Sequence, residues 1–543
     1  MSKKPDQPVF GLSILKMKTF HKARRDLLRA MSLATMILPL SNHAWAQHRF
    51  DKNPFLLGVA SGSPTDRSIV LWTRLIDDNL FSSGLSNSPI EVKWEIAKDR
   101  QFTQIIQSGL SLAVPALAYS VHAEVNQLPA NQWFFYRFQV GGQMSAVGRT
   151  RTLPAPGQVV EQLKLAYASC QHYEHGYFTA YQFMRTEDVD LLMFLGDYIY
   201  EYGPGRKGVR THDSGPLISL DDYRKRYVLY KKDQNLQAMH ATCPWLMTWD
   251  DHEVQNDYAG LNPGKSGPYV SDFPARRAAA YQAYYEHMPL KSSVLIEGIE
   301  GLMRGAEMRI YGDFQFGKLA NITMLDDRQY RDPNICSPNA QGSAIIDPKS
   351  CPELKAPERS ILGGEQEKWL INKLKNSNQS IWNVIGQPTL YAQRYFPSND
   401  QLLIWNDGWD GFPAARQRLN QALIQNQVKN VVLFGGDVHE NWVSYIKADY
   451  DKQDSAILGV EFCGTSLTSI GEGAKYIDAR LSKNPHFIFA EATKKGYGIA
   501  EFTPKALTVS LRVLTNAQNE DASIETLAKF VVQSHSNKII RLS

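Results

Sequence analysis

The chain has 543 residues, of which 43% are hydrophobic and 21% are charged, which excludes a disordered chain and allows a sizeable core. Its formal net charge of +4 is too small to indicate binding to nucleic acid or to a membrane surface. The length alone corresponds to about three domains of average size.

The first 46 residues have the pattern of an export signal. An arginine pair, Arg24-Arg25, precedes an apolar stretch at 31–40, and an Ala-x-Ala cleavage pattern at 44–46 precedes Gln47. The arginine pair indicates export by the twin-arginine pathway, so the protein would interact with the twin-arginine export machinery. The apolar stretch is shorter than the ~20 residues that span a bilayer. We therefore expect a periplasmic or extracellular protein without stable membrane insertion; an amphipathic helix with a chance arginine pair is the alternative.

Residues 50–154 are predicted to form an all-β domain. Stretches at 68–73, 91–96 and 133–140 have strand length and β-rich composition, and no long helical pattern separates them. Short strands at near-regular spacing indicate an immunoglobulin-like or fibronectin-like sandwich. A proline-rich linker at 152–157 marks the predicted domain boundary.

From residue 160 to 543, predicted strands and helices alternate, which indicates an α/β layered fold with a β-rich carboxyl-terminal segment. Expected strands lie at 165–170, 191–195, 319–325, 381–385, 428–434, 499–502, 507–513 and 530–532. Expected helices lie at 178–186, 221–230 and 275–287.

Cysteine is sparse, with five residues and no CxxC spacing, which excludes a zinc ribbon and a thioredoxin site. Cys336 and Cys351 flank a loop rich in proline, asparagine, glycine and serine. In an oxidising compartment they can close a disulfide, and free thiols are the alternative.

Potential metal ligands follow four predicted strands. The apolar run 191–195 ends at Gly196 and is followed by Asp197 and Tyr200. The other three strand ends carry Cys170, then Asp250, Asp251 and His252, then Asp437 and His439. Ligand sites of open α/β sheets gather where strands end. A capping aspartate, a core cysteine or a packed tyrosine explains any one segment, but four such segments together favour a common site.

The residue types indicate a metal centre with two kinds of ion. Tyrosinate and thiolate suit a trivalent ion such as Fe³⁺, whereas carboxylates and an amide oxygen such as that of Asn256 suit Ca²⁺, Mg²⁺ or Mn²⁺. One carboxylate, that of Asp197, can bridge two ions about 3.5–4 Å apart, as two-metal hydrolases require. His252, beside Asp251, is placed to protonate a leaving alkoxide.

Five motifs together resemble the PhoD-type alkaline phosphatase/phosphodiesterase family, within the calcineurin-like metallophosphatases and related to purple acid phosphatases. They lie at 168–171, 173–181, 195–201, 249–253 and 436–439. Asp251 and Asp437 stand where purple acid phosphatases have asparagine and histidine, which moves the site toward oxygen donors. No match to their Val-x-x-His segment is evident.

The resemblance implies an α/β metallophosphatase sandwich of two mixed β-sheets flanked by helices, preceded by an N-terminal all-β domain. It implies hydrolysis of small phosphate mono- and diesters at alkaline pH by a metal-activated hydroxide. The implied cofactors are Fe³⁺ and Ca²⁺, with Mn²⁺, Mg²⁺ or Zn²⁺ possible at the second site.

The resemblance also assigns roles to individual residues. The implied iron ligands are Cys170, Asp197, Tyr200 and His439. The implied calcium ligands are Asp197, Asp251, Asp437 and Asn256. His252 would be the general acid. Arg328, in the family-like segment 325–331, is expected either to contact the substrate phosphate or to belong to a surface salt-bridge cluster.

Two other functions remain as alternatives. A phospholipase D-like phosphodiesterase acting on lipid head groups would use the same chemistry. A non-catalytic surface-binding protein with a decayed site is a different class, and the intact set of ligand residues argues against it. A haem or copper protein lacks the required ligand spacing.

Overall fold

The computed structural model describes most of the chain. The described residues are 50–76, 88–205, 208–296, 307–338, 342–398 and 401–543. The predicted export signal at 1–46 lies outside the described residues. Among the described helices, none combines the length and the apolar composition that crossing a bilayer demands.

A ten-stranded mixed sheet forms the first central layer. Its middle strands, β9 (Leu163–Ala168), β10 (Leu191–Leu195) and β11 (Trp245–Thr248), are parallel neighbours. β10 is apolar and buried along its whole length, as expected for a parallel strand covered on both faces. The outer strands are β22 (Gly496–Phe502), β23 (Ala506–Leu514), β24 (Ile524–Gln533) and β25 (Ile539–Arg541) on one side, and β1 (Val59–Gly62), β2 (Ile69–Arg74) and β5 (Ser120–Val125) on the other.

A seven-stranded mixed sheet forms the second layer. Four strands run parallel at its centre, in the order β13, β15, β18 and β20. The strands in sheet order are β12 (Gly312–Phe316), β13 (Ala320–Met324), β15 (Trp382–Gly386), β18 (Val431–Gly435), β20 (Ile457–Cys463), β19 (Asn441–Lys447) and β21 (Phe487–Glu491).

The two central sheets pack face to face through one apolar core, in which Met193 and Leu246 of the first sheet join Ile322 and Val432 of the second. Helices α2 to α5 cover the other face of the first sheet, and α8 and α9 cover the other face of the second. The described helices are α2 (Ala180–Met184), α3 (Leu220–Lys231), α4 (Gln234–His240), α5 (Phe273–His287), α6 (Ser293–Ile296), α8 (Gly363–Leu374), α9 (Pro413–Gln425) and α10 (Ile477–Lys483). The expectation of mixed sheets flanked by helices is therefore confirmed.

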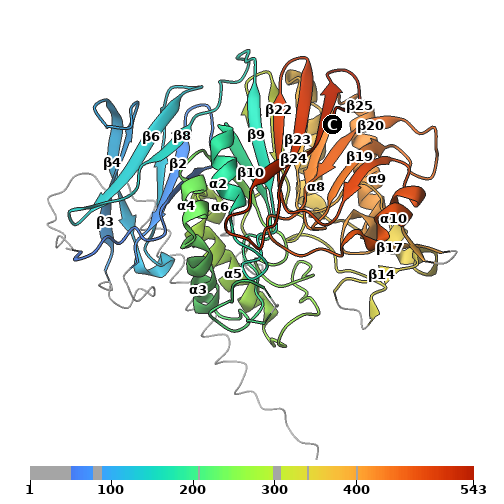
Figure 1. The fold of residues 1–543 in the computed structure, drawn as a ribbon, viewed down its shortest axis with the longest axis horizontal. Coiled ribbons are helices and arrows are strands. Elements are labelled where there is room, and N and C mark those ends of the chain that lie inside the picture. The colour runs from blue at the N-terminus through green and yellow to red at the C-terminus, as the bar shows by residue number, and fades with distance from the viewer. Residues whose placement is uncertain (1–49, 77–87, 206–207, 297–306, 339–341, 399–400) are drawn as a thin grey trace, which may run out of the picture.

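The N-terminal strands are not separate from the central sheet. β1 pairs with β11 through Gly62 and Trp245, so β1, β2 and β5 extend the ten-stranded sheet. They share an apolar core with a five-stranded sheet, which Figure 1 shows at one end of the molecule. That sheet contains β3 (Ile90–Ala97), β4 (Ile105–Ala113), β6 (Trp133–Val140), β7 (Gln143–Met144) and β8 (Gly148–Arg151). The predicted boundary at 154 therefore separates two parts of the sequence, but the ten-stranded sheet contains strands from both parts.

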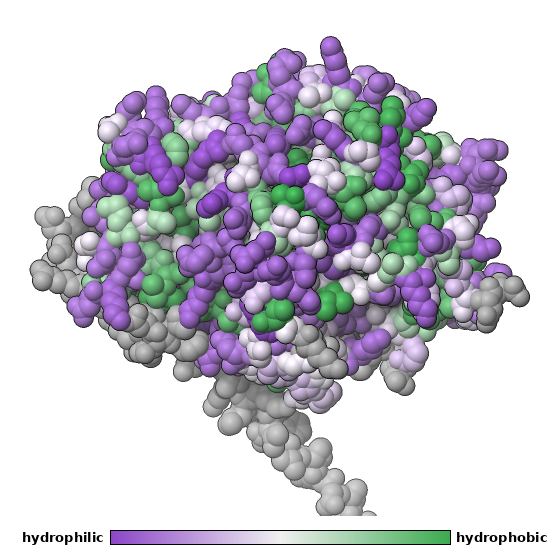
Figure 2. Space-filling model, in the orientation of Figure 1, coloured by the Kyte–Doolittle hydropathy of each residue, from purple (hydrophilic) through white to green (hydrophobic). Residues whose placement is uncertain are grey.

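A small three-stranded sheet lies outside the two layers. It is formed by β14 (Ile345–Ile346), β17 (Gln401–Trp405) and β16 (Phe396–Ser398). Cys336 and Cys351, on either side of β14, form a disulfide, which decides between the two expected states of this pair. On the face drawn in Figure 2, hydrophilic residues cover most of the surface, with small hydrophobic groups between them.

Local sequence explains where several elements begin. Ser219 and Asp222 form a capping box at the start of α3, and Asp272 caps α5. Several expected boundaries are wrong. The strand expected at 428–434 begins at Val431, and the strand expected at 530–532 is only part of β24. The helix expected at 178–186 is only α2 followed by a short 3₁₀ turn, Arg185–Glu187. The strand expected to reach Cys170 ends at Ala168, because the backbone turns left-handed at the cysteine.

Candidate metal centre

The strand-end residues expected to bind metal converge in the structure. Cys170, Asp197 and His439 each offer a ligand atom, and these atoms lie within 4.8 Å of one another. Asp197, Asp251 and His252 form a second such group. These residues follow β9, β10, β11 and β18, which belong to both central sheets. Asp197 belongs to both groups and is the carboxylate that they share.

The first group is connected by hydrogen bonds. The Tyr200 hydroxyl donates to Asp197 Oδ2 at 2.7 Å and lies 3.3 Å from His439 Nε2. His439 Nδ1 lies 3.0 Å from the Ile470 carbonyl oxygen, which can only accept. Nδ1 therefore carries the proton, and the Nε2 lone pair faces Tyr200 and Asp197, as a metal-binding imidazole requires.

Four residues of the centre have a left-handed backbone although none is glycine. The φ angles are 58° at Cys170, 59° at Asp197, 65° at Asp437 and 57° at His439. Such conformations are uncommon for residues with a Cβ, and they cluster at functional sites, where the surrounding structure holds them in place. Each one turns the chain sharply just after a strand end.

Two glycines allow the strand-end loops to approach one another closely. A Cβ on Gly196 would lie 2.5 Å from the Asp250 Cβ atom, and one on Gly436 would lie 2.4 Å from the Ser169 Oγ atom. Both distances are far below van der Waals contact, so only glycine fits. Gly196 brings the Asp197 loop against the Asp250 loop, and Gly436 brings the Asp437 loop against the Cys170 loop.

The centre carries more buried negative charge than its cations balance. Asp197 Oδ1, Asp250 Oδ2 and Asp251 Oδ1 are buried and have no hydrogen-bond partner among the described residues. The buried Arg328 pairs with Asp250, lies 2.7 Å from Asp407 and lies 3.8 Å from Asp251. Even with Arg331, which lies 3.6 Å from Asp407, and a protonated His252, the cations are fewer than the buried carboxylates. Several buried carboxylate oxygen atoms without hydrogen-bond partners fit the ligands of bound metal ions.

The pKa values of the centre also fit a metal. Burial raises the pKa of Asp251 to about 6 and raises those of Asp250 and Asp437 well above their usual range. Burial likewise raises the pKa values of the Cys170 thiol and the Tyr200 phenol. The protein alone therefore favours the protonated thiol and phenol, and the positive charge of a metal is what would favour thiolate and tyrosinate.

His252 is held by a buried carboxylate. Its Nδ1 atom lies 2.7 Å from Glu201 Oε2, so Nδ1 is the protonated nitrogen when the ring is neutral. Burial lowers the pKa of His252, but the negative charges of Asp197, Asp251 and Glu201 outweigh it and raise this pKa well above its usual range. The imidazole is thus oriented and favoured as a proton donor in the metal-free protein.

Several supporting residues were missed by the sequence analysis. Ser469 Oγ lies 2.6 Å from the Tyr200 hydroxyl and 2.8 Å from the Cys170 carbonyl oxygen. Thr389 donates to Asp437 Oδ2 at 2.8 Å. Both follow parallel strands of the second sheet, β20 and β15, so the same strand-end signal could have found them. Asp407 follows β17 of the small sheet, a strand that was not among those expected from the sequence.

Two predicted site residues have other partners. The Asn256 side-chain oxygen accepts a hydrogen bond from the Tyr202 hydroxyl at 2.9 Å. Arg328 is buried in a cluster of carboxylates, so its salt bridges lie inside the protein and not at the surface, where the alternative expectation placed them. Its Nη1 atom has no hydrogen-bond partner among the described residues, so a contact with substrate phosphate stays a prediction.

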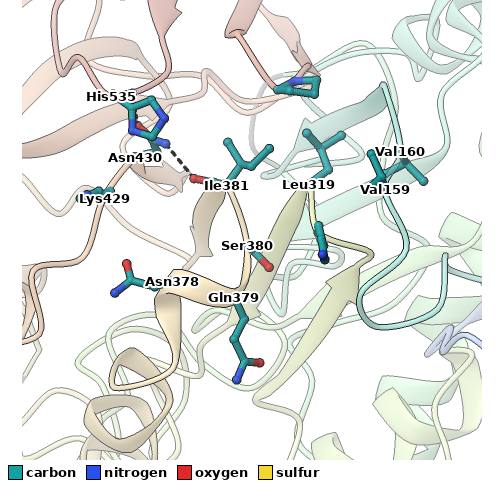
Figure 3. A pocket seen from close by; sticks show the side chains of 12 residues that line it. Val159, Val160, Leu319, Asn378, Gln379, Ser380, Ile381, Lys429, Asn430 and His535 are labelled. Atoms are coloured by element: carbon teal, nitrogen blue, oxygen red, sulfur yellow. Dashed lines mark hydrogen bonds between the residues drawn. The ribbon is translucent and has the colours of Figure 1, made fainter.

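A separate cavity lies at the opposite end of the second sheet. It has a volume of about 470 Å³, and Leu319, Ile381 and Asn430, which precede β13, β15 and β18, line it. Figure 3 shows the Asn430 side chain donating to the Ile381 carbonyl oxygen, at 2.8 Å. This cavity is remote from the strand ends that carry the ligands, so it is not part of the metal centre.

A carboxylate shared by two groups of candidate ligands, at the strand ends of a two-sheet α/β fold, is an arrangement typical of two-metal hydrolases. The PhoD-like phosphatase family matches residues 165–511, and the N-terminal domain of PhoD-like phosphatases matches residues 41–154. Alkaline phosphatase D of Bacillus subtilis (strain 168) is 44% identical over 506 residues, which cover 92% of this chain and 84% of the relative. The solved structure of PhoD superposes with a TM-score of 0.85 at 44% identity, covering 91% of this chain and 93% of that one.

The chain belongs to the PhoD-like phosphatase family. The family expected from the motifs is therefore confirmed, and so is its class, a phosphoric ester hydrolase. The structure contains candidate metal-binding groups, as a PhoD-type metalloenzyme requires.

Proposed function

We propose that this protein is an exported alkaline phosphatase/phosphodiesterase that hydrolyses small phosphate mono- and diesters at a centre with at least two metal ions. The observation that carries the proposal is the position of Asp197, whose carboxylate lies between the Cys170/His439 group and the Asp251/His252 group. The name of the Bacillus subtilis relative supports the alkaline phosphatase activity. Export rests on the signal pattern at 1–46.

The two groups have different donor chemistry, which supports two different ions. Cys170, Tyr200 and His439 with Asp197 would hold Fe³⁺, because phenolate and thiolate favour a trivalent Lewis acid. Asp197, Asp251 and Asp437 would hold Ca²⁺, or alternatively Mn²⁺, Mg²⁺ or Zn²⁺, because they offer only carboxylate oxygens. Asn256 would join them by rotating its amide away from Tyr202.

When bound, the ions would polarise the phosphoryl oxygens of the ester and lower the pKa of an attacking water. His252 would give its proton to the alcohol oxygen as the P–O bond breaks, so that the alcohol leaves neutral. Glu201 orients this imidazole through Nδ1 and stabilises its charged form. Glu253 accepts hydrogen bonds from the backbone N–H groups of Tyr198 and Asp250 and so holds the two ligand loops together.

The test is hydrolysis of a chromogenic phosphate ester by exported protein, together with elemental analysis and an absorption spectrum. We expect iron and a divalent ion, a tyrosinate-to-iron charge-transfer band, and loss of hydrolysis after exhaustive chelation. Undiminished hydrolysis by fully chelated protein would overturn the metal mechanism. A preference for lipid head-group release over simple esters would favour the phospholipase D-like alternative.

A further inference from the structure

A second cavity opens directly beside the metal centre. It has a volume of about 400 Å³, and Asp437 and His439 form part of its lining. Trp405, Phe396 and Ile345 of the small three-stranded sheet also line it. A phosphoryl group held at the metal centre would therefore have this space next to it.

The small sheet supplies an apolar wall. Ile345 is directly opposite Trp405 in the antiparallel pair of β14 and β17, so their side chains leave the sheet on the same face. Phe396 is opposite Leu403, which is two residues from Trp405, so Phe396 shares that face. Ile345 is 48% exposed, which leaves this apolar face open to a ligand.

Four charged side chains of the cavity are already paired with one another. Glu440 lies 3.2 Å from Arg394 and 3.5 Å from Arg480, and Arg480 also pairs with Glu472. Two guanidinium groups thus face two carboxylates, which leaves no net positive charge for a second anion. Both guanidinium groups also lie near the Phe396 ring, at 4.3 Å for Arg480 and 4.8 Å for Arg394.

The wall is anchored on both sides, so the cavity is preformed. The Asn484 side chain accepts from the Tyr395 N–H at 2.8 Å and donates to the Tyr395 carbonyl oxygen at 2.9 Å, which ties the start of β16 to the end of α10. The Cys336–Cys351 disulfide closes the segment that contains β14. Preformed cavities that combine an apolar wall with polar groups that fix a ligand's orientation are typical of small-molecule sites.

We propose that this cavity holds the alcohol part of the phosphate ester and selects planar, apolar alcohol groups. The inference rests on the proposed function, because it requires a phosphoryl group at the metal centre. Trp405 is the specificity-determining residue, with Ile345 beside it. Aryl esters would then bind better than small aliphatic esters, while the phosphoryl contacts stay the same for both.

The experiment compares aryl and aliphatic probes on metal-loaded protein. We expect Trp405→Ala to raise KM for 1-naphthyl phosphate, and Ki for phenylphosphonate, about tenfold, as loss of an aromatic anchor typically does. The values for glycerol phosphate and methylphosphonate should change less than about twofold. Ile345→Ala should also raise KM and Ki for the aryl probes relative to those for the aliphatic probes. Trp405→Phe should keep most of the wild-type preference for aryl probes.

The matched control is Leu402→Ala on the same strand. Leu402 is 40% exposed and lies an odd number of residues from Trp405, so it faces the other side of the sheet. Leu402→Ala should leave KM and Ki unchanged for both the aryl and the aliphatic probes. Equal shifts for aryl and aliphatic probes in the Trp405 and Ile345 variants, or no shift, would overturn the cavity proposal alone. Wild-type protein that hydrolyses neither ester would instead overturn the proposed function.

Discussion

At the scale of single residues, Asp197 should matter most for metal binding and hydrolysis, because it is the carboxylate that both ligand groups share. We expect Asp197→Asn to lose both kinds of metal and to reduce hydrolysis by at least about a thousandfold, since an amide cannot supply the bridging charge. Tyr200→Phe and His439→Ala should lose iron and activity together. Elemental analysis and initial rates with a chromogenic ester measure these losses.

Asp449→Asn is the control for this series, because Asp449 is a surface carboxylate paired only with Lys452 among the described ion pairs. It should keep its metal and its activity. An Asp197→Asn protein that retains a full complement of both metals would contradict the bridging role. A Tyr200→Phe protein with an unchanged charge-transfer band would contradict the assignment of the phenol as an iron ligand.

His252 should separate metal binding from proton transfer. We expect His252→Ala to keep its metal and to lose about 10²- to 10⁴-fold in kcat on alkyl esters, the range of general acid catalysis. The loss should be much smaller for 4-nitrophenyl phosphate, because nitrophenolate leaves without a proton. Glu201→Gln should show the same trend more weakly, since it keeps a hydrogen-bonding group beside Nδ1. Equal losses for good and poor leaving groups would exclude this role.

Most of the ligand residues that sequence analysis found share one property: each closely follows an apolar strand. Cys170, Asp197 and Asp437 were visible for that reason, and the structure brings them to one place. Their left-handed backbone was not visible, because none is a glycine. Asp407 was missed because it reaches Arg328 from a separate small sheet, a contact 79 residues along the chain that no local pattern encodes.

At the scale of elements, Gly436 sets the distance between the end of β18 and the loop after β9. We expect Gly436→Ala to reduce kcat about a hundredfold, because displacing ligands by about 1 Å costs that much. The added methyl group would contact Ser169 and the Pro388 carbonyl oxygen, which moves the Asp437 loop away from Cys170. Rates and metal content of the purified variant measure the effect.

Gly364→Ala is the matched control, since a Cβ at Gly364 in α8 has no heavy atom within 4 Å. It should leave activity unchanged and slightly raise stability, because alanine favours a helix. A Gly436→Ala protein with wild-type rates would show that the two loops do not need their close approach.

Strands were predictable where they are buried on both faces. β10 and β18 are short apolar runs between turn residues, so their existence and nearly their bounds followed from the sequence. The extension of the central sheet by β1 was not predictable. Its sequence, Val59 to Gly62, is short and consists mostly of residues with small side chains. Its partner Trp245 lies almost two hundred residues away.

At the scale of the whole molecule, the face-to-face packing of two sheets creates the site and also places mutually repelling carboxylates close together. Strand ends from both sheets meet, which concentrates carboxylates that are buried at 3% exposure or less, including Asp197, Asp250 and Asp251. Their mutual repulsion opposes folding when all are charged and no cation is bound. Metal binding should therefore contribute to stability as well as to catalysis.

The stabilisation by metal should depend on pH in a defined direction. Burial raises the pKa of Asp251 to about 6 in the metal-free protein. The stability that its protonated form contributes is complete below about pH 4, the usual pKa of an aspartate, and is lost as the pH rises through about 6. Above that pH the metal no longer has to displace this proton, so the metal binds more tightly. Over the same range the folded metal-free protein becomes less stable.

We therefore expect the difference in melting temperature between metal-loaded and chelated protein to widen as the pH rises from about 5 to about 8, since metal ligands must be deprotonated. Differential scanning calorimetry of both forms across this range measures the difference, which cancels the titration of groups remote from the centre. Asp251→Asn should flatten the pH dependence, whereas the surface variant Asp449→Asn should follow the wild type. A difference that stays constant or narrows with rising pH would mean that these carboxylates are not the groups that the metal neutralises.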